Sequence, residues 1–330
     1  MSMMDEKARI LDLRKELEKY SIEYYVYDNP SVTDQEYDRL MQELMALEEK
    51  HPEMQDANSP SQRIIGSVLE GFEKVTHDSQ MLSLGNVFNK EEIEEFVQRI
   101  SESVSNPEFV VECKYDGLAM ALLYDDGNFT RAVTRGDGIV GEDVSNNVKT
   151  ILSIPMHIPE MRHVEVRGEV YMPKASFELL NKRQEEKGLA PFANPRNAAA
   201  GSIRQLDSSV CASRKLDAYW YYFQNASDFA VQTQEEALEA MSKMHFRTNP
   251  LRKVCTTVDE IWQFIQEIQE KREDLPYEID GMVIKLNNLG GDISRSNYRK
   301  ALVDYFTPLK DKLCTDCQKR LELNPLRILD

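Results

Sequence analysis

Two short apolar runs flank a lysine and a turn near the middle of the chain. Phe109–Val111 precedes Lys114, and Leu118–Tyr124 follows Gly117. Short apolar runs bounded by Asp-Gly are typical of buried strands joined by a turn. The pattern therefore places Lys114 at the end of a buried strand, with Asp116 two residues further along in the turn.

This position gives the amine of Lys114 two alternative roles. Burial disfavours a charged ammonium, and a neutral lysine amine is a nucleophile. Asp116 could then orient the amine or hold a metal ion. A strand-end lysine that pairs with a turn aspartate on the surface would leave the same pattern. The stretch alone leaves both interpretations open.

Length and charge limit the class of protein. A chain of 330 residues, 41% of them hydrophobic, is long enough for two or three domains with real cores. No apolar run approaches the roughly 18 residues that span a bilayer, no signal sequence opens the chain, and the five scattered cysteines favour a reducing cytoplasm. The net charge of -17 argues against a general coat for nucleic acid. We therefore expect a soluble, monomeric, cytoplasmic protein without a membrane partner, in which DNA contact is local and weak.

The first fifty residues predict a pair of amphipathic helices. Ile10, Leu13 and Leu17 recur at helical spacing, and Thr33–Glu36 has the sequence of a capping box that starts the second helix. A tyrosine–aspartate cluster lies around the connection and consists of Tyr24, Tyr25, Asp34, Tyr37 and Asp38. Tyrosine faces and aspartate charges suit a flat, positively charged ring. Packing tyrosines and helix-capping aspartates would explain the same residues.

Three later segments carry charged residues beside glycines or at strand ends. Arg135 stands in a glycine-rich loop, where it could grip a phosphate or stack on a base. Glu169 lies in the alternating stretch 164–172, which predicts a strand whose charged face is solvated or lines a polar site. Lys285 ends an apolar run that begins just after Asp280, and Lys114 likewise follows the apolar run Phe109–Val111.

The segment 192–207 combines small residues with Arg196 and Arg204. Such a segment suits close packing that presents cations to a phosphate backbone, although an alanine helix with surface arginines fits equally well. Phosphoryl-type chemistry needs a nucleophile, cations for phosphate oxygens and carboxylates for Mg²⁺, and the chain supplies all three. The residues alone therefore predict a nucleotide-handling transferase with a lysine nucleophile.

Several strings of residues resemble one family in order and spacing. Lys114–Gly117 fits the K-x-D-G signature of covalent nucleotidyltransferases, and the surrounding strings resemble those of bacterial NAD-dependent DNA ligases over about residues 5–288. The strings are Tyr24–Val26 with Asp34–Asp38, Met81–Leu84, Glu112–Lys114, Thr134–Gly138, Val166–Val170, Asn194–Asp207 and Ile279–Lys285. The chain thus resembles the N-terminal adenylation part of these ligases.

The resemblance implies a defined reaction. Lys114 would attack the α-phosphate of NAD⁺, expel nicotinamide mononucleotide (NMN) and hold AMP as a phosphoramidate. The AMP would pass to the 5′-phosphate of nicked DNA, and the 3′-hydroxyl would displace it during replication and repair. Lys285 would meet the α-phosphate, and Asp116 and Asp280 would assist catalysis or bind Mg²⁺.

The resemblance also divides NAD⁺ between two sets of residues. The tyrosine–aspartate cluster would hold the NMN half, which separates users of NAD⁺ from users of ATP. The family often has histidine where Tyr25 stands. Glu169 would meet the ribose, and the adenosine site would be lined by Ser83, Leu84, Glu112 and, nearby, Arg135.

We expect an α+β fold in three parts. Residues 1–70 would form a helical NAD-recognition module, and residues 71–288 a nucleotidyltransferase domain, similar to ATP-grasp-like ligases, of packed antiparallel sheets and helices. Residues 289–330 lack the family's next motif, a tryptophan-containing strand with an essential lysine, so we interpret them as a frameshifted, foreign or disordered end. Cys314 and Cys317 make only half a zinc site, and we expect no zinc here.

Self-adenylation with NAD⁺ is the expected activity, and nick sealing by this chain alone is not expected. Two alternatives stay open. One is a nucleotidyltransferase that uses ATP or GTP, and the other is an NAD-binding protein whose catalysis is impaired because the last motif is missing.

Overall fold

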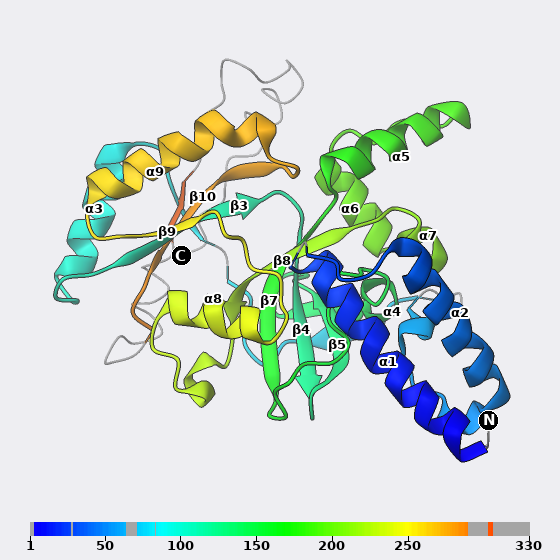
Figure 1. The fold of residues 1–330 in the computed structure, drawn as a ribbon. Coiled ribbons are helices and arrows are strands. Elements are labelled where there is room, and N and C mark those ends of the chain that lie inside the picture. The colour runs from blue at the N-terminus through cyan, green and yellow to red at the C-terminus, as the bar shows by residue number, and fades with distance from the viewer. Residues whose placement is uncertain (1–2, 28, 64–70, 83, 290–302, 306–330) are drawn as a thin grey trace.

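The protein begins with a pair of antiparallel helices (Figure 1). The computed structural model describes residues 3–27, 29–63, 71–82, 84–289 and 303–305. Helix α1 (Met3–Tyr25) packs on α2 (Asp34–Lys50), and their apolar stripes form a core of Ile10, Leu13, Leu17, Leu40, Leu44 and Leu47. Thr33 Oγ1 accepts a hydrogen bond from the Glu36 N–H at 3.3 Å. The Glu36 carboxylate pairs with Arg39, so only half of the expected capping box forms.

A five-stranded sheet carries both lysines that the sequence singles out. Its strands, in spatial order, are β2 (Gly85–Val87), β11 (Val303–Tyr305), β10 (Ile279–Leu286), β3 (Phe109–Tyr115) and β9 (Arg252–Cys255). β3 and β10 run antiparallel, with Lys114 opposite Gly281. Helices α3 (Lys90–Ser101) and α9 (Val258–Lys271) contribute to the core on one face, which includes Phe96.

A four-stranded antiparallel sheet forms the centre of the largest core. Its strands, in spatial order, are β5 (Asn128–Thr134), β4 (Leu118–Asp125), β7 (Val164–Tyr171) and β8 (Asp217–Phe223). Helix α8 (Gln234–Lys243) packs against β8, and Tyr124, Trp220 and Phe246 are fully enclosed. β4 and β5 form the hairpin that the sequence predicts. Both faces of β7 are buried, so its charged residues do not face solvent.

The turn after Lys114 connects the two sheets. Both predicted strands form, but they do not pair, because β3 lies between β10 and β9 whereas β4 lies between β5 and β7. A Cβ atom on Gly117 would lie 2.3 Å from the carbonyl oxygen of Val170. Only glycine therefore allows the chain to cross here, and the crossing places Lys114 where the two sheets meet.

Short elements complete the fold. β1 (Lys74–Thr76) pairs with β6 (Val140–Glu142) in a separate sheet. Helix α4 (Ser145–Val148) is short, because the N–H groups of Thr150 and Ile151 bond three residues back rather than four. Three helices lie together at one end of the molecule in Figure 1, namely α5 (Lys174–Glu186), α6 (Pro195–Ile203) and α7 (Ser208–Ala212). The 3₁₀ helices are η1 (Pro52–Met54), η2 (Pro60–Gln62), η3 (Ala226–Phe229) and η4 (Arg272–Asp274).

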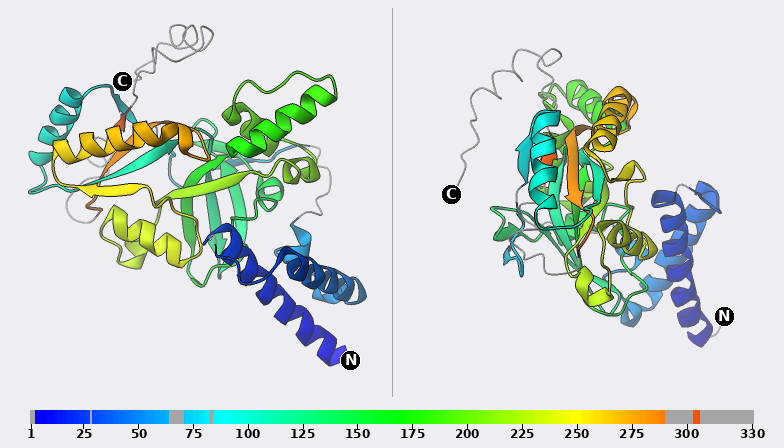
Figure 2. Two further views of the ribbon diagram at one scale, coloured as in Figure 1. Left: turned by 45° about the horizontal axis from the view of Figure 1, so that its top comes forward. Right: turned by 90° about the vertical axis from the view of Figure 1, so that its left-hand side faces the viewer.

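The helical pair lies at one side of the molecule, apart from α3 and α9 (Figure 2). Polar contacts attach the helical pair to the rest of the protein. The carboxylate of Glu18 accepts the His157 backbone N–H at 2.8 Å and lies 3.0 Å from His157 Nδ1. The Tyr27 hydroxyl lies 2.9 Å from Nδ1 of His245. Arg63 is buried and donates to two backbone carbonyls just before His157.

Some expectations concern residues outside this description. Ser83 is one of them, and so are most residues of the 289–330 tail, including Cys314 and Cys317. Across the described residues, no helix combines the length and apolar character needed to cross a bilayer.

Candidate active site

Lys114 is held by a carboxylate of the neighbouring strand. Its Nζ donates to both oxygens of Asp280, at 2.8 and 2.7 Å. The side chain of Lys114 is 24% exposed and that of Asp280 is 20% exposed, so the pair is sheltered but reachable. The carboxylate fixes the amine and is placed to accept the proton that a nucleophilic amine must lose.

Asp116, which the sequence suggested as the partner of Lys114, contacts a different cation. Its Oδ1 lies 3.3 Å from Nη1 of Arg196. Strand β10 runs beside β3 and brings Asp280 to the amine, whereas Asp116 lies just after the end of β3. Burial, together with the charge of Asp280, raises the pKa of Asp116.

The two aspartates have the chemistry of a magnesium site that is completed by a substrate. Mg²⁺ is usually held by one or two carboxylates together with waters and substrate phosphates. Asp116 and Asp280 feel each other's charge, and a divalent cation would relieve that repulsion. In the described part of the chain, no group of three or more His, Cys, Asp or Glu residues forms a metal site. Both residues therefore fit Mg²⁺ only as part of a larger ligand set.

Glu169 lies close to Lys114 from the other sheet. The hydroxyl of Tyr221 donates to Glu169 Oε2 at 3.2 Å. Burial raises the pKa of Glu169 to about 8, although the nearby charge of Lys114 and the bond from Tyr221 oppose this shift. At neutral pH this carboxyl therefore largely keeps its proton, so it can donate a hydrogen bond and does not repel a phosphate.

The raised pKa of Glu169 predicts a pH-dependent stability. The native state binds this proton more tightly than the unfolded chain between about pH 4.5 and about pH 8, so stability falls as pH rises through that window. We expect the unfolding free energy of the wild-type chain to fall by about 4 kcal/mol more than that of Glu169→Gln between these limits. Urea unfolding at both pH values measures the difference, and an equal fall in the two proteins would contradict it.

A second lysine, Lys285, forms a buried ion pair with Glu112. Its Nζ lies 2.9 Å from Glu112 Oε1 and donates to the carbonyl of Tyr221 at 2.8 Å. The amide of Gln234 donates to the same two acceptors, at 3.0 and 2.9 Å. Burial lowers the pKa of Lys285, and the charge of Glu112 opposes this effect. The network joins β3 and β10 of one sheet to β8 of the other.

The segments predicted to line an adenosine site lie side by side. The N–H of Met81 donates to the carbonyl of Gly138 at 2.9 Å, which attaches the Met81–Leu84 string to the loop that begins with exposed Arg135. Leu84 is half-buried. Buried Arg167 donates to two carbonyls just before Met81, at 2.6 and 3.0 Å, and so anchors this segment to β7.

The residues of the tyrosine–aspartate cluster lie at the connected ends of α1 and α2. The rings of Tyr24 and Tyr25 lie 4.7 Å apart, and the Tyr37 hydroxyl lies 2.9 Å from Ser21 Oγ. Burial, then the proximity of Tyr37, Tyr24 and Asp34, raises the pKa of Tyr25 to about 12. Asp38 is exposed on α2. Among the described contacts, none joins this cluster to the residues around Asp280.

The two arginines proposed for DNA contact occupy the ends of α6 and are about half exposed. Arg196 lies in the first turn of the helix and pairs with Asp116, which links it to the lysine site. Arg204 follows the helix, and its Nε lies 3.2 Å from Glu142.

Three members of the site escaped the sequence analysis, namely Tyr221, Gln234 and Arg167. Tyr221 belongs to an aromatic strand whose pattern predicts only core packing, and Gln234 is the first residue of a helix, where a polar residue is common. Arg167 belongs to the charged face of the stretch 164–172, which gives it no individual signal. Their roles arise from contacts between the two sheets and their connections, for which a local pattern holds no signal.

Fold and site together define a class of protein. A lysine held by a carboxylate lies where the two sheets of an α+β domain meet, and a second, buried lysine lies on the neighbouring strand β10, which is the arrangement of a covalent nucleotidyltransferase. The chain belongs to the NAD-dependent DNA ligase family. The model of the NAD-dependent DNA ligase adenylation domain matches residues 69–293, and that of the DNA ligase-like, N-terminal NAD⁺-binding domain matches residues 3–65.

Curated relatives agree with the family assignment. The chain is 51% identical over 284 residues to a DNA ligase of Bacillus subtilis (strain 168), which covers 86% of this chain and 42% of the relative. A DNA ligase of Bacillus velezensis is 50% identical over 291 residues, or 87% of this chain and 44% of the relative. The chain therefore spans less than half the length of these relatives.

Solved structures of other ligases are only distantly similar. The bacteriophage T7 ATP-dependent DNA ligase in complex with ATP is 13% identical, with a TM-score of 0.33 and 68% of each chain covered. Mycobacterial DNA ligase D with ATP and MES is 12% identical, with a TM-score of 0.33. The match covers 60% of this chain and 54% of the ligase D chain. Likeness at this level carries no weight for the function.

Proposed function

We propose that this chain adenylates itself with NAD⁺ and that Lys114 is the nucleophile. The amine attacks the phosphorus on the adenosine side, so that an N–P bond forms and the P–O bond to NMN breaks. NMN leaves with the electron pair of that bond, and the proton of the amine passes to Asp280 or to solvent. The observation that carries the proposal is the amine held 2.7 and 2.8 Å from the two Asp280 oxygens at the meeting point of the sheets.

Residues of both sheets would hold the adenylate half of NAD⁺. Glu169, protonated at neutral pH, would donate to a ribose hydroxyl without repelling the phosphate. The adenosine would contact Glu112, Ser83, Leu84 and Arg135. Lys285 lies against Glu112, so its ammonium must leave the Tyr221 carbonyl if it is to reach the α-phosphate.

The tyrosine–aspartate cluster would hold the NMN half. Paired tyrosine rings beside Asp34 supply the faces and the negative charge that suit a nicotinamide cation. In this proposal residues 1–70 act as the NMN module and residues 71–288 as the adenylation domain. Mg²⁺ would bind at Asp116 and Asp280 together with substrate phosphates.

The relatives' name suggests the role of the whole protein. We infer that the lysyl-AMP serves the sealing of nicked double-stranded DNA in replication and repair, in the cytoplasm of a bacterium. Arg196 and Arg204 would contact that DNA, and the chain would act as a monomer. This chain spans less than half the length of its relatives, and the step that we propose for it is adenylation.

Intact-mass spectrometry with NAD⁺ or ATP, each with Mg²⁺, tests the proposal. We expect a gain of one AMP from NAD⁺ alone, released by acid as a phosphoramidate should be, and mapped by peptide analysis to Lys114. A gain from ATP instead would favour a nucleotidyltransferase of the ATP-using kind. Binding of NAD⁺ without any gain of mass would mean that adenylation is lost.

A further inference from the structure

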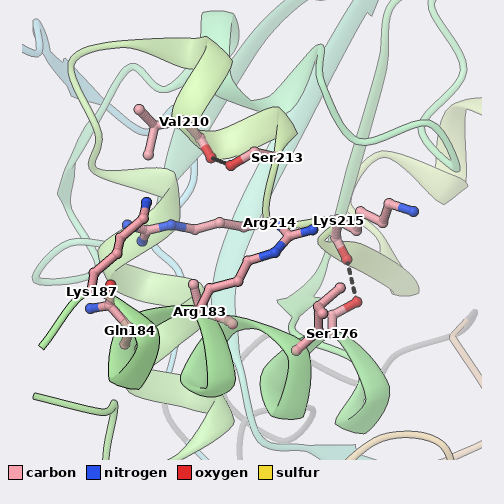
Figure 3. Close-up of a pocket in the computed structure, with 10 residues that line it drawn as sticks. Ser176, Arg183, Gln184, Lys187, Val210, Ser213, Arg214 and Lys215 are labelled. Atoms are coloured by element: carbon pink, nitrogen blue, oxygen red, sulfur yellow. Dashed lines mark hydrogen bonds between the residues drawn. The ribbon is translucent and has the colours of Figure 1, made fainter. Parts of the chain in front are cut away.

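A basic cavity lies between α5 and the segment that follows α7, outside the site described above (Figure 3). Its volume is about 140 Å³, several times the roughly 30 Å³ that one water molecule occupies in the liquid. Four cations line it: Arg183, Lys187, Arg214 and Lys215. The hydroxyl of Ser176 on α5 donates to the Lys215 carbonyl at 3.2 Å, which holds the two walls together.

The cavity has no internal countercharge. None of its lining residues is acidic, although the chain carries 57 acidic and 40 basic residues. The three glutamates of α5 lie outside the lining. Within the described structure, none of the four cations has a carboxylate partner within 4.0 Å. A protein this acidic has ample carboxylates to neutralise a surface cation, so a cavity lined by four cations without a carboxylate partner indicates an anion site.

Arg214 shows most clearly that the cavity is built to hold charge. Its guanidinium lies 5.4 Å from the centre of the Phe192 ring, and its Nη1 donates to the hydroxyl of Ser202 at 3.1 Å. Burial lowers the pKa of Arg214. A partly buried guanidinium held by a ring and one hydroxyl has donors left over, and its geometry suits two oxygens of one phosphate.

We propose that this cavity binds a backbone phosphate of double-stranded DNA at a distance from the nick. Ser202, which holds Arg214, lies on α6, and the two ends of α6 carry Arg196 and Arg204. The cavity therefore extends a line of cations that starts at Arg196, which pairs with Asp116 near the lysine site. Arginine, lysine and serine side chains are the usual donors to DNA phosphates. The inference rests on the proposed function, which makes nicked DNA the substrate.

Reversing two exposed charges tests the inference on the full chain. Arg183→Glu with Lys187→Glu removes cations from the cavity and leaves the packed Arg214 in place. The control is Lys182→Glu with Lys243→Glu, an equal charge change at exposed positions on α5 and α8 outside the lining. Fluorescence anisotropy with a labelled, nicked duplex gives the affinity between about 50 and about 200 mM salt. We expect the cavity variant to bind roughly tenfold more weakly than the control and its log–log salt slope to fall by about 1 to 2.

Each other outcome overturns the inference. Equal DNA affinities and equal salt slopes in the two variants would show that the cavity cations do not contact DNA. Failure of the wild-type chain to bind the duplex at the lowest salt would also contradict the inference. If the variants bind DNA equally but inorganic phosphate raises the melting temperature of the control alone, the cavity takes a free anion. Both variants should gain AMP from NAD⁺ as the wild type does. Failure of all three proteins to gain AMP would count against the proposed function, but the comparison of their DNA affinities would still stand.

Discussion

Replacing Lys114 with alanine abolishes the gain of AMP from NAD⁺, because the reaction has no other route to a covalent adenylate. A phosphoramidate needs a lysine amine at the attacking position, and Lys114 is held at the meeting point of the sheets by Asp280, a carboxylate able to take its proton. NAD⁺ binding should survive, since the other proposed contacts remain. Intact mass measures the adenylate, and equilibrium dialysis measures the bound NAD⁺.

Two further variants separate chemistry from folding. Lys114→Arg keeps a cation beside Asp280 but removes the nucleophilic amine, so it should fold normally and gain no AMP. Lys149→Ala removes a lysine that lies away from the site, donates to the Ala57 carbonyl at 2.9 Å and has its pKa lowered by burial, and this variant should gain AMP like the wild type. An AMP adduct on Lys114→Arg, or its loss in Lys149→Ala, would contradict the assignment.

The sequence predicted those parts of the fold that depend on neighbouring residues. The stripe of Ile10, Leu13 and Leu17 repeats at helical spacing, and α1 buries these residues. The apolar runs around Lys114 are long enough for strands, and β3 and β4 form there. In each case residues within one or two turns decide the structure, so a local pattern is sufficient evidence.

The partners of the catalytic groups depend on contacts that no local pattern records. Asp280 is 166 positions from Lys114, and the register between β3 and β10 brings the two together. Asp116, two residues from Lys114, contacts Arg196, which is 80 positions away. The pKa of Glu169 likewise follows from burial where the sheets meet. Site residues were thus recognisable by type and motif, but their pairing required the sheet order.

Breaking the buried pair of Glu112 and Lys285 should destabilise the fold strongly, because it leaves a charge without its partner between the two sheets. Both side chains are at least nine-tenths buried. Arg252, the other cation near Glu112, already pairs with Glu235 at 2.8 Å. Among the described residues, Lys285→Met therefore leaves the buried Glu112 carboxylate with the Gln234 amide as its hydrogen-bond donor, and removal of one partner from a buried pair costs about 3–5 kcal/mol. Urea unfolding at neutral pH measures this loss.

A double-mutant cycle shows whether the loss comes from the stranded charge. Glu112→Gln with Lys285→Met leaves no buried charge, so the double variant should be more stable than Lys285→Met alone, with a coupling of about 2 kcal/mol or more. Lys90→Met is the control, because it breaks an exposed ion pair with Asp259 whose N–O distance is 2.6 Å. It should change the free energy of unfolding little, because water solvates the remaining carboxylate. Additive losses in the buried pair would mean that packing, rather than charge, holds the two sheets together at this point.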